Sequence, residues 1–383
     1  MHLYIHIPFC LKKCSYCDFA SYGIDYFNGV PPLSDYFEAL RMEIDLRTAS
    51  FEAKPAAETI YFGGGTPGVG GIENIVKTLD LLKDKFITDE SCEITVETNP
   101  RIFDAAGYGK LREAGFNRIS IGMQSGDDKV LALLGRVHDA SEALRALALA
   151  REAGFKNISA DFMTAIPYKK GENYQKSDFA AIGELQLDHV SIYQFSVCEN
   201  TPVHSMVKSG ELIELSDEEA AEEYLSVCSQ LLKAGFIHYE VSNFARNRNF
   251  ISRHNRSYWR KEDYMGFGAG AVSTLGAIRQ QNSGGVFEYI GGVGTQNYYL
   301  LETLSGPDLL LETIMLALRT DEGLRKNAIT PEIFDKIHGD PKIISLAENG
   351  LLILKKENIA LTDAGFLVMN KIALIVEEIA VLK

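Results

Sequence analysis

Six short runs rich in apolar and β-branched residues alternate with amphipathic stretches in the first half of the chain. The expected strands are LYIHI (3–7), ETIYF (58–62), CEITVE (92–97), NRISIG (117–122), NISADF (157–162) and HVSIYQF (189–195). Helical patterns such as SDYFEALRMEIDL (34–46) and SEALRALALAREAG (141–154) lie between them. Strands that alternate with helices are typical of a parallel sheet built from β–α units. We therefore predict an α/β fold.

An internal repeat supports this prediction. The segment REAGFNRIS at 112–120 returns as REAGFKNIS at 151–159, an offset of 39 residues (112 to 151). Gly115 and Gly154 stand where a helix can end in a left-handed residue before the next strand. Solenoid arrays show similar periods. Six unequal units with differing strand ends favour a barrel-like sheet over a solenoid.

The pattern changes after about residue 210. The segment 216–235 is typical of a helix, with Ser216 as N-cap and Glu219 completing a capping box. A glycine-rich region follows. From about residue 306 a helix, a short hairpin and a further helix suggest a winged-helix-like module. The predicted domains are a barrel over 1–210, a barrel extension over 211–305 and a small C-terminal domain over 306–383.

Composition and hydropathy restrict the cellular compartments and the classes of partner that we expect for this protein. No run approaches the roughly 18 apolar residues that span a bilayer. The opening LYIHIPF is too short for a secretory signal, so we expect a cytoplasmic protein with reduced thiols. The net charge of −14 argues against extensive nucleic-acid binding, which needs clustered Lys and Arg.

Three of the six cysteines are crowded into eight positions directly after the first expected strand. Cys10, Cys14 and Cys17 have the spacing C-x3-C-x2-C. Thiolates at these offsets can hold three corners of a four-iron cluster, which leaves one iron open to another ligand. A zinc site or buried structural thiols are the alternatives, although zinc sites usually use a second cysteine pair. The other cysteines lie in apolar patterns and are expected in the core: Cys92, Cys198 and Cys228.

The cysteine spacing, with an aromatic Tyr16 before the last cysteine, resembles the signature of the radical S-adenosylmethionine superfamily. The resemblance implies a partial (β/α)6 barrel, a [4Fe–4S] cluster and S-adenosylmethionine. In that superfamily the open iron chelates the amino and carboxylate groups of S-adenosylmethionine. The reduced cluster then cleaves it to methionine and a 5′-deoxyadenosyl radical.

Other motifs resemble the same superfamily. YFGGGTP (61–67) by itself indicates only a turn. After a strand it resembles the motif that binds the methionine amino group, which implies roles for Gly64, Gly65 and Thr66. Polar residues at the carboxyl ends of barrel strands point into the barrel mouth, and Glu97, Gln124 and Asp161 stand at such positions. As single residues they would more often be solvated or capping.

The resemblance is strongest to the subgroup of oxygen-independent coproporphyrinogen III dehydrogenases and HemW-like haem chaperones, and it covers nearly the whole chain. It is carried by YIHIPFC (4–10), GGGTP, ISIGMQS (119–125) and LTDAGF. By position it implies cofactor contacts from Tyr4, Tyr16, Glu97, Gln124, Arg136, Asp161 and Ser196. Ser196 matches least well, since the subgroup has Ala there.

Three features favour the chaperone branch. The dehydrogenases carry a further cysteine where this chain has Phe19, and an extension before the first strand that is not expected here. HNRSYW (254–259) resembles the HNxxYW motif of the haem chaperones. The resemblance therefore implies haem as a cofactor, haem-accepting apoproteins as partners, and S-adenosylmethionine cleavage without dehydrogenase activity.

Two readings compete with this one. The first is the dehydrogenase, which converts coproporphyrinogen III to protoporphyrinogen IX. The second is a radical RNA-modifying enzyme, which the acidic composition disfavours.

Two details of the resemblance stay open. His254 can ligate haem iron through its imidazole, with Tyr258 and Trp259 packing on the porphyrin. A hydrogen-bonded structural histidine is the alternative. The subgroup's YGLPGQT is replaced by TAIPYKKG (164–171), so glycines become Ala165 and Tyr168. We expect the backbone of this loop to differ.

Overall fold

The computed structural model describes residues 1–172, 174, 179–295 and 298–381. The chain divides into two compact units. Unit 1 comprises Met1–Gln175, Tyr193–Leu215 and Asp263–Glu302, and unit 2 comprises Lys176–Ile192, Ser216–Glu262 and Thr303–Lys383. The expected extension over 211–305 is thus divided between the units. No helix among the described residues is long and apolar enough to cross a membrane.

Unit 1 is built on five parallel strands in the order β7–β6–β5–β4–β1. Their bounds are β1 (His2–Ile7), β4 (Thr59–Gly64), β5 (Glu93–Thr98), β6 (Arg118–Gln124) and β7 (Asn157–Thr164). The sixth expected strand forms as β9 (His189–Gln194), and the boundary between the units falls within it. All six strand predictions are confirmed. Leu3, Ile5 and Ile7 on one face of β1 are fully buried, and His2 and His6 on the other face are also buried, as expected for a parallel strand covered on both faces.

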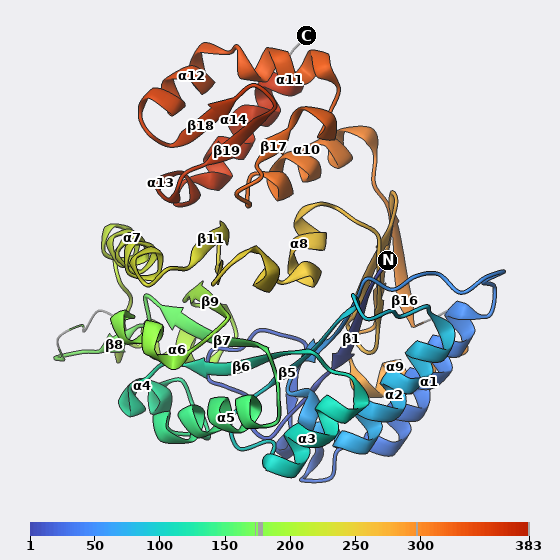
Figure 1. The fold of residues 1–383 in the computed structure, drawn as a ribbon. Helices are drawn as coiled ribbons and strands as arrows, with labels where there is room; N and C mark the ends of the chain where they lie inside the picture. The colour runs from blue at the N-terminus through green and yellow to red at the C-terminus, as the bar shows by residue number, and fades with distance from the viewer. Residues whose placement is uncertain (173, 175–178, 296–297, 382–383) are drawn as a thin grey trace. The chain divides into compact units, whose positions relative to one another are not determined.

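Helices follow the strands of unit 1 in sequence (Figure 1). They are α1 (Leu33–Thr48), α2 (Ile72–Lys85), α3 (Ala105–Ala114), α4 (Asp128–Leu133) and α5 (Ala140–Glu152). In α2 the buried residues Ile75, Leu79 and Leu82 are spaced at helical intervals and form one apolar stripe. Gly115 and Gly154 have φ of 106° and 92°, which confirms the predicted left-handed ends of the repeated helices.

The glycine-rich region continues the sheet of unit 1 beyond β1. Its elements are β13 (Tyr264–Phe267), β14 (Val272–Leu275), β15 (Ile278–Asn282), α9 (Val286–Gly292) and β16 (Tyr299–Thr303). β13 pairs with β1 in parallel, and β14 and β15 continue antiparallel. The buried carboxylate of Glu43 on α1 holds this region. It accepts hydrogen bonds from Gly268 N (2.8 Å), Asn282 Nδ2 (2.8 Å) and the Tyr289 hydroxyl (2.6 Å).

Short elements complete unit 1 around the cysteines and the loop after β7. They are β2 (Phe9–Cys10), β3 (Tyr22–Gly23), β8 (Tyr168–Lys169), α6 (Pro202–Lys208) and β10 (Leu212–Ile213). β2 pairs with β3, and β8 pairs with β10. These pairings fix both ends of the cysteine loop and tie 168–169 to 212–213.

The segment Ser216–Glu262 of unit 2 contains α7 (Asp217–Lys233), β11 (Ile237–Glu240), β12 (Asn243–Ala245) and α8 (Arg253–Trp259). The predicted capping box is confirmed, because the Ser216 side chain accepts from Glu219 N and the Glu219 side chain accepts from Ser216 N. The C-terminal module contains α10 (Gly306–Ala317), β17 (Leu324–Arg325), α11 (Pro331–His338), α12 (Pro341–Glu348), β18 (Leu352–Lys355), β19 (Asn358–Leu361), α13 (Asp363–Phe366) and α14 (Met369–Val381). Its strands form a sheet in the order β17–β19–β18, as in a winged-helix-like module.

Candidate cofactor site

The three clustered cysteines lie on one loop at the carboxyl end of β1. Cys10 ends β2, and the loop is held from within by the bond from Cys17 N to Cys14 O (3.3 Å). A second bond, from Ser15 N to Leu134 O (3.2 Å), ties the loop to the end of α4. All three thiols are partly exposed and free of disulfides. The loop therefore presents three sulfurs held by backbone bonds.

Each of the three sulfurs has a polar side chain beside it. The Thr66 hydroxyl donates to Cys10 Sγ (3.7 Å), and Arg136 Nη1 donates to Cys14 Sγ (3.3 Å). Ser21 Oγ lies 3.6 Å from Cys17 Sγ. Such donors stabilise thiolates and sulfur-bound metal.

Electrostatics favour a cation at these thiols. Burial raises the pKa of Cys10 to about 11, and the neighbouring Cys14 and Cys17 raise it further. Three thiolates can share such a confined place only if positive charge compensates them, which iron does. The donor set therefore fits a [4Fe–4S] cluster held by three cysteines.

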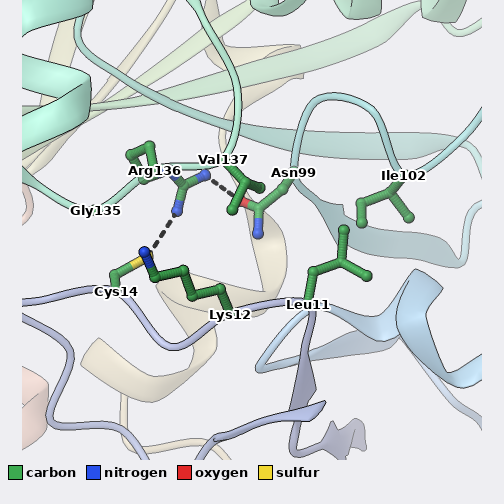
Figure 2. A pocket seen from close by; sticks show the side chains of 8 residues that line it. All are labelled: Leu11, Lys12, Cys14, Asn99, Ile102, Gly135, Arg136 and Val137. Carbon is green, nitrogen blue, oxygen red and sulfur yellow. Dashed lines mark hydrogen bonds between the residues drawn. The ribbon is translucent and has the colours of Figure 1, made fainter. Parts of the chain in front are cut away.

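A side-chain network connects two of the donors, and Figure 2 shows the part of it in which Arg136 donates to Cys14 and to Asn99. Asn99 Nδ2 donates to Thr66 Oγ1 (2.8 Å), and the Asn99 Oδ1 accepts from Arg136. Arg136 Nη2 also donates to Gly122 O (2.8 Å). Sequence reasoning missed Asn99, although it follows Glu97 by two positions just past the end of β5. The available signal was a polar residue at the mouth end of a strand.

The glycine run after β4 packs on the cysteine loop. Gly65 N donates to Ile7 O (2.9 Å), and Thr66 N donates to Phe9 O (2.8 Å). A Cβ on Gly65 would lie 2.8 Å from Phe9 O, and Gly64 has a left-handed φ of 108°. These glycines are therefore required for the contact between two backbones. The contact places Thr66 at Cys10.

Two carboxylates face one another across the parallel strands. Glu97 Oε1 accepts from the Tyr61 hydroxyl (2.6 Å), and Asp161 Oδ1 accepts from the Ser120 hydroxyl (3.0 Å). Burial raises the pKa of Glu97 to about 7, and the nearby Asp161 carboxylate adds to this rise. A bound ammonium group would favour the charged forms of both carboxylates.

The structure brings together some of the remaining predicted contacts. The Tyr4 hydroxyl lies 3.1 Å from His6 Nδ1, and the Tyr4 ring stacks on Tyr61. Gln124 ends β6 with a left-handed φ of 66°. A Cβ on Gly122 would touch the side chains of Asn99, Gln124 and Arg136, so these three converge.

Two predicted positions and one cysteine lie around the same loop. Tyr16 packs against Phe195 in an apolar cluster. Ser196 is exposed, and its carbonyl accepts from the Cys198 thiol (3.7 Å). The prediction that Cys198 belongs to the core is wrong, because it is half-exposed on the loop after β9. Burial, with Asp18 and Cys17 adding, raises the pKa of Cys198. Cys92 and Cys228 are buried as predicted.

A pocket opens beside the cysteines. Its volume is about 470 Å³, and it is lined by Lys13, Cys14, Cys17, Asp18, Glu199, Asn200, Thr201 and Pro202. Pockets of roughly 300–1,000 Å³ accommodate small cofactors. The small cavity drawn in Figure 2, of about 10 Å³, lies on another side of Cys14 and holds no more than a water molecule.

His254 lies in unit 2, on α8. Its imidazole is buried, and Nε2 is 2.9 Å from the Tyr258 hydroxyl. The Arg319 guanidinium lies 5.8 Å from the centre of the Trp259 ring. In this conformation His254 is a hydrogen-bonded, buried histidine.

The loop where the subgroup's glycines are replaced keeps one glycine-like feature. Ala165 has a left-handed φ of 55°, a conformation that favours glycine. Tyr168 begins the short strand β8. The loop thus accepts a strained alanine at the end of β7.

Comparison with known proteins shows the family to which the chain belongs. Residues 4–178 match the family model of the Radical SAM superfamily, and residues 304–368 match the HemN C-terminal domain. A Bacillus subtilis protein named Heme chaperone HemW is 33% identical, covering 96% of this chain and 97% of its own. The Bos taurus mitochondrial radical S-adenosyl methionine domain-containing protein 1 is 32% identical, covering 97% and 86%.

A solved structure has the same fold. Coproporphyrinogen III oxidase (HemN) from Escherichia coli, described as a radical SAM enzyme, superposes with a TM-score of 0.81 over 98% of this chain and 89% of that chain. Its sequence identity is 24%, so the likeness concerns the fold alone. The predicted α/β radical SAM fold is confirmed.

Proposed function

The chain belongs to the HemW family of radical S-adenosylmethionine proteins, and from this premise we propose that it binds haem and delivers it to haem-accepting apoproteins. Membership in the superfamily implies a [4Fe–4S] cluster and S-adenosylmethionine. Phe19 is the observation that carries the choice of the chaperone over the dehydrogenase. It stands where the dehydrogenases have a further cysteine, and its side chain is 66% exposed. We place this activity in the cytoplasm.

The residues of unit 1 have distinct roles in this proposal. Cys10, Cys14 and Cys17 hold three irons, while Thr66 and Arg136 donate to the first two sulfurs. Gly64, Gly65 and Thr66 would bind the methionine amino group of S-adenosylmethionine, and Glu97 and Asp161 would contact the same cofactor. A bound [4Fe–4S] cluster would, when reduced, supply the electron for cleavage of S-adenosylmethionine. The proposed contacts of Tyr4, Tyr16, Gln124 and Ser196 remain predictions.

His254 is our proposed axial ligand to haem. Its Nε2 faces the Tyr258 hydroxyl at 2.9 Å, so this hydrogen bond must break before the nitrogen can bind iron. A neutral imidazole nitrogen is a common ligand for haem iron. The Tyr258 hydroxyl therefore competes with haem for the same nitrogen.

A haem titration of three proteins tests this role. His254→Ala should shift the Soret band and weaken binding at least tenfold, a loss of about 1.4 kcal/mol. Tyr258→Phe removes the competing hydroxyl while keeping the ring, so it should preserve the Soret position and strengthen binding. An unchanged Soret maximum and affinity in His254→Ala would leave His254 a structural residue.

A separate assay tests the alternative function, the coproporphyrinogen III dehydrogenase activity. Reconstituted protein with reductant and S-adenosylmethionine should form no protoporphyrinogen IX from coproporphyrinogen III. Formation at about 1 per second, or even a hundredfold slower, would favour the dehydrogenase instead.

A further inference from the structure

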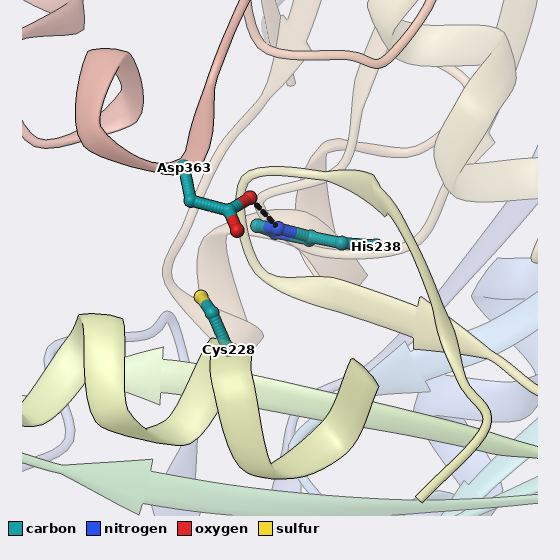
Figure 3. Close-up of side chains that lie close together, drawn as sticks. All are labelled: Cys228, His238 and Asp363. Carbon is teal, nitrogen blue, oxygen red and sulfur yellow. Dashed lines mark hydrogen bonds and ion pairs between the residues drawn. The ribbon is translucent and has the colours of Figure 1, made fainter. Parts of the chain in front are cut away.

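A second group of metal-binding side chains lies in unit 2, outside the cysteine loop. It consists of Cys228 on α7, His238 on β11 and Asp363 in the first turn of α13 (Figure 3). One ligand atom from each residue lies within 4.8 Å of the other two. Asp363 is 125 residues away from His238 in the chain, so the fold of unit 2 assembles the group.

The geometry of the group is fixed by its surroundings. The His238 ring stacks on Phe244 at 4.1 Å between centroids and packs against Phe366 at 5.3 Å. Its Nδ1 lies 2.7 Å from Asp363 Oδ1. The His238 side chain is 4% exposed, whereas Asp363 is 37% exposed. The imidazole is therefore held in place, and solvent reaches the group from the Asp363 side.

The charges of the group favour a cation. Burial raises the pKa of Cys228 to about 12, and the Asp363 carboxylate adds to the rise. A bound divalent ion would instead lower the pKa of this thiol, because the ion binds the thiolate directly. Sulfur, imidazole nitrogen and carboxylate oxygen are the three ligand types that zinc takes in proteins.

We propose that Cys228, His238 and Asp363 form a site for a zinc-type divalent ion, with water as the fourth ligand. In a tetrahedral zinc site the ligand atoms are about 3.3–3.8 Å apart, given metal–ligand bonds of roughly 2.0–2.3 Å. The three ligand atoms lie within 4.8 Å of one another, so a shift of about 1 Å brings them to these separations. The ion would join α7, β11 and α13, and so link the first helix of unit 2 to its C-terminal module.

Cobalt binding tests the site in full-length protein whose cluster thiols are removed by Cys10/Cys14/Cys17→Ala. Any thiolate-to-cobalt absorption then comes from another cysteine. We expect one Co²⁺ per chain, near-ultraviolet charge-transfer absorption and visible bands of tetrahedral cobalt, all displaced by Zn²⁺. Adding Cys228→Ser should abolish the charge transfer, and Asp363→Asn should weaken binding at least tenfold. Cys92→Ser, at another buried thiol, is the matched control and should change nothing.

A second measurement does not depend on the triple variant. Wild-type protein and Cys228→Ser, both carrying the cluster thiols, should differ by one zinc per chain after incubation with Zn²⁺ and desalting. Absence of charge transfer in the triple variant, its persistence in Cys228→Ser, or equal zinc contents would overturn the proposal. The residues would then form only a His238–Asp363 hydrogen bond beside a buried thiol. Neither test depends on haem or S-adenosylmethionine.

Discussion

At the residue scale, Asn99 is the side chain that joins the donors of two cluster sulfurs. It donates to Thr66 and accepts from Arg136, which in turn donate to Cys10 and Cys14. Hydrogen bonds to cluster sulfurs raise the reduction potential because they stabilise the more negative, reduced state. Asn99 is thus expected to set the potential without touching a sulfur.

Asn99→Ala should therefore lower the cluster potential. The loss of about 1 kcal/mol of hydrogen bonding corresponds to roughly 40 mV for one electron. A potentiometric titration followed by electron paramagnetic resonance measures this shift. Asn117→Ala is the matched control, since Asn117 bonds to the backbone of Cys92 and Ile94. An equal shift in both variants would show that the effect is not specific to the sulfurs.

The raised pKa of Glu97 predicts that the stability of the cofactor-free protein depends on pH. Its pKa of about 7 in the fold lies above the ordinary value of 4.5, because the carboxyl is buried. The folded protein therefore keeps a proton that the unfolded chain releases between these pH values. The resulting stabilisation is complete below pH 4.5 and is lost as the pH rises to 7, by roughly 3 kcal/mol.

Urea unfolding at pH 5 and pH 8 measures this loss. Glu97→Gln should make stability less dependent on pH over the same range. Glu240 in unit 2 also has a pKa raised to about 7 by burial. Glu240→Gln should therefore give a further reduction, which is additive because the groups that shift the two pKa values are different. A pH dependence unchanged in Glu97→Gln would contradict the raised pKa.

At the scale of elements, the end of β7 contains a strained position. Ala165 adopts φ of 55°, which costs an L-residue about 1–2 kcal/mol relative to glycine. Replacing the alanine by glycine removes this strain from the folded protein. Part of the gain is offset, because glycine increases the conformational entropy of the unfolded chain. Ala165→Gly should thus stabilise the protein by about 0.5–1 kcal/mol in urea unfolding. Ala153→Gly, at a right-handed helix end, is the control and should destabilise.

The sequence predicts the elements well where one physical signal dominates. Buried parallel strands contain apolar, β-branched runs, so β1, β4 and β5 are found within two residues of the expected ends. The capping box at Ser216 is local and was equally predictable. β13 and β14 were not predicted, because the glycines at 266, 268 and 270 interrupt the strand pattern between Tyr264 and Val272. A Cβ on Gly266 would lie 2.2 Å from Val272 O, so close backbone approach explains the glycine.

The sequence predicted the cysteines of the candidate site, but it did not predict the whole network of side chains around their sulfurs. The spacing predicts Cys10, Cys14 and Cys17 as metal ligands. The role of Asn99 can be recognised only from the structure, because its partners Thr66 and Arg136 come from different β–α units. Cys198 was misplaced because its prediction as core gave too little weight to two signals, the end of the expected strand at 195 and the polar Glu199 and Asn200 that follow it.

At the scale of the whole molecule, the cluster ligands lie in unit 1 and His254 lies in unit 2. Each unit is compact by itself, and sites whose residues do not interact contribute independently, within about 0.3–0.5 kcal/mol. Haem binding and cluster binding should therefore be separable by mutation. This separation distinguishes haem carried at His254 from haem carried at the cysteines.

A double-mutant cycle tests the separation. Cys10/Cys14/Cys17→Ala should lose its iron and bind haem within about twofold of the wild type, as the limit of additivity allows. His254→Ala should keep its iron and bind haem at least tenfold more weakly, because the lost iron–nitrogen bond is worth about 1.4 kcal/mol or more. Iron analysis and haem titration on the four proteins give both values, and circular dichroism checks that each is folded. A tenfold loss of haem affinity in the cysteine variant would mean that haem depends on the cysteine loop, and the assignment to His254 would then fail.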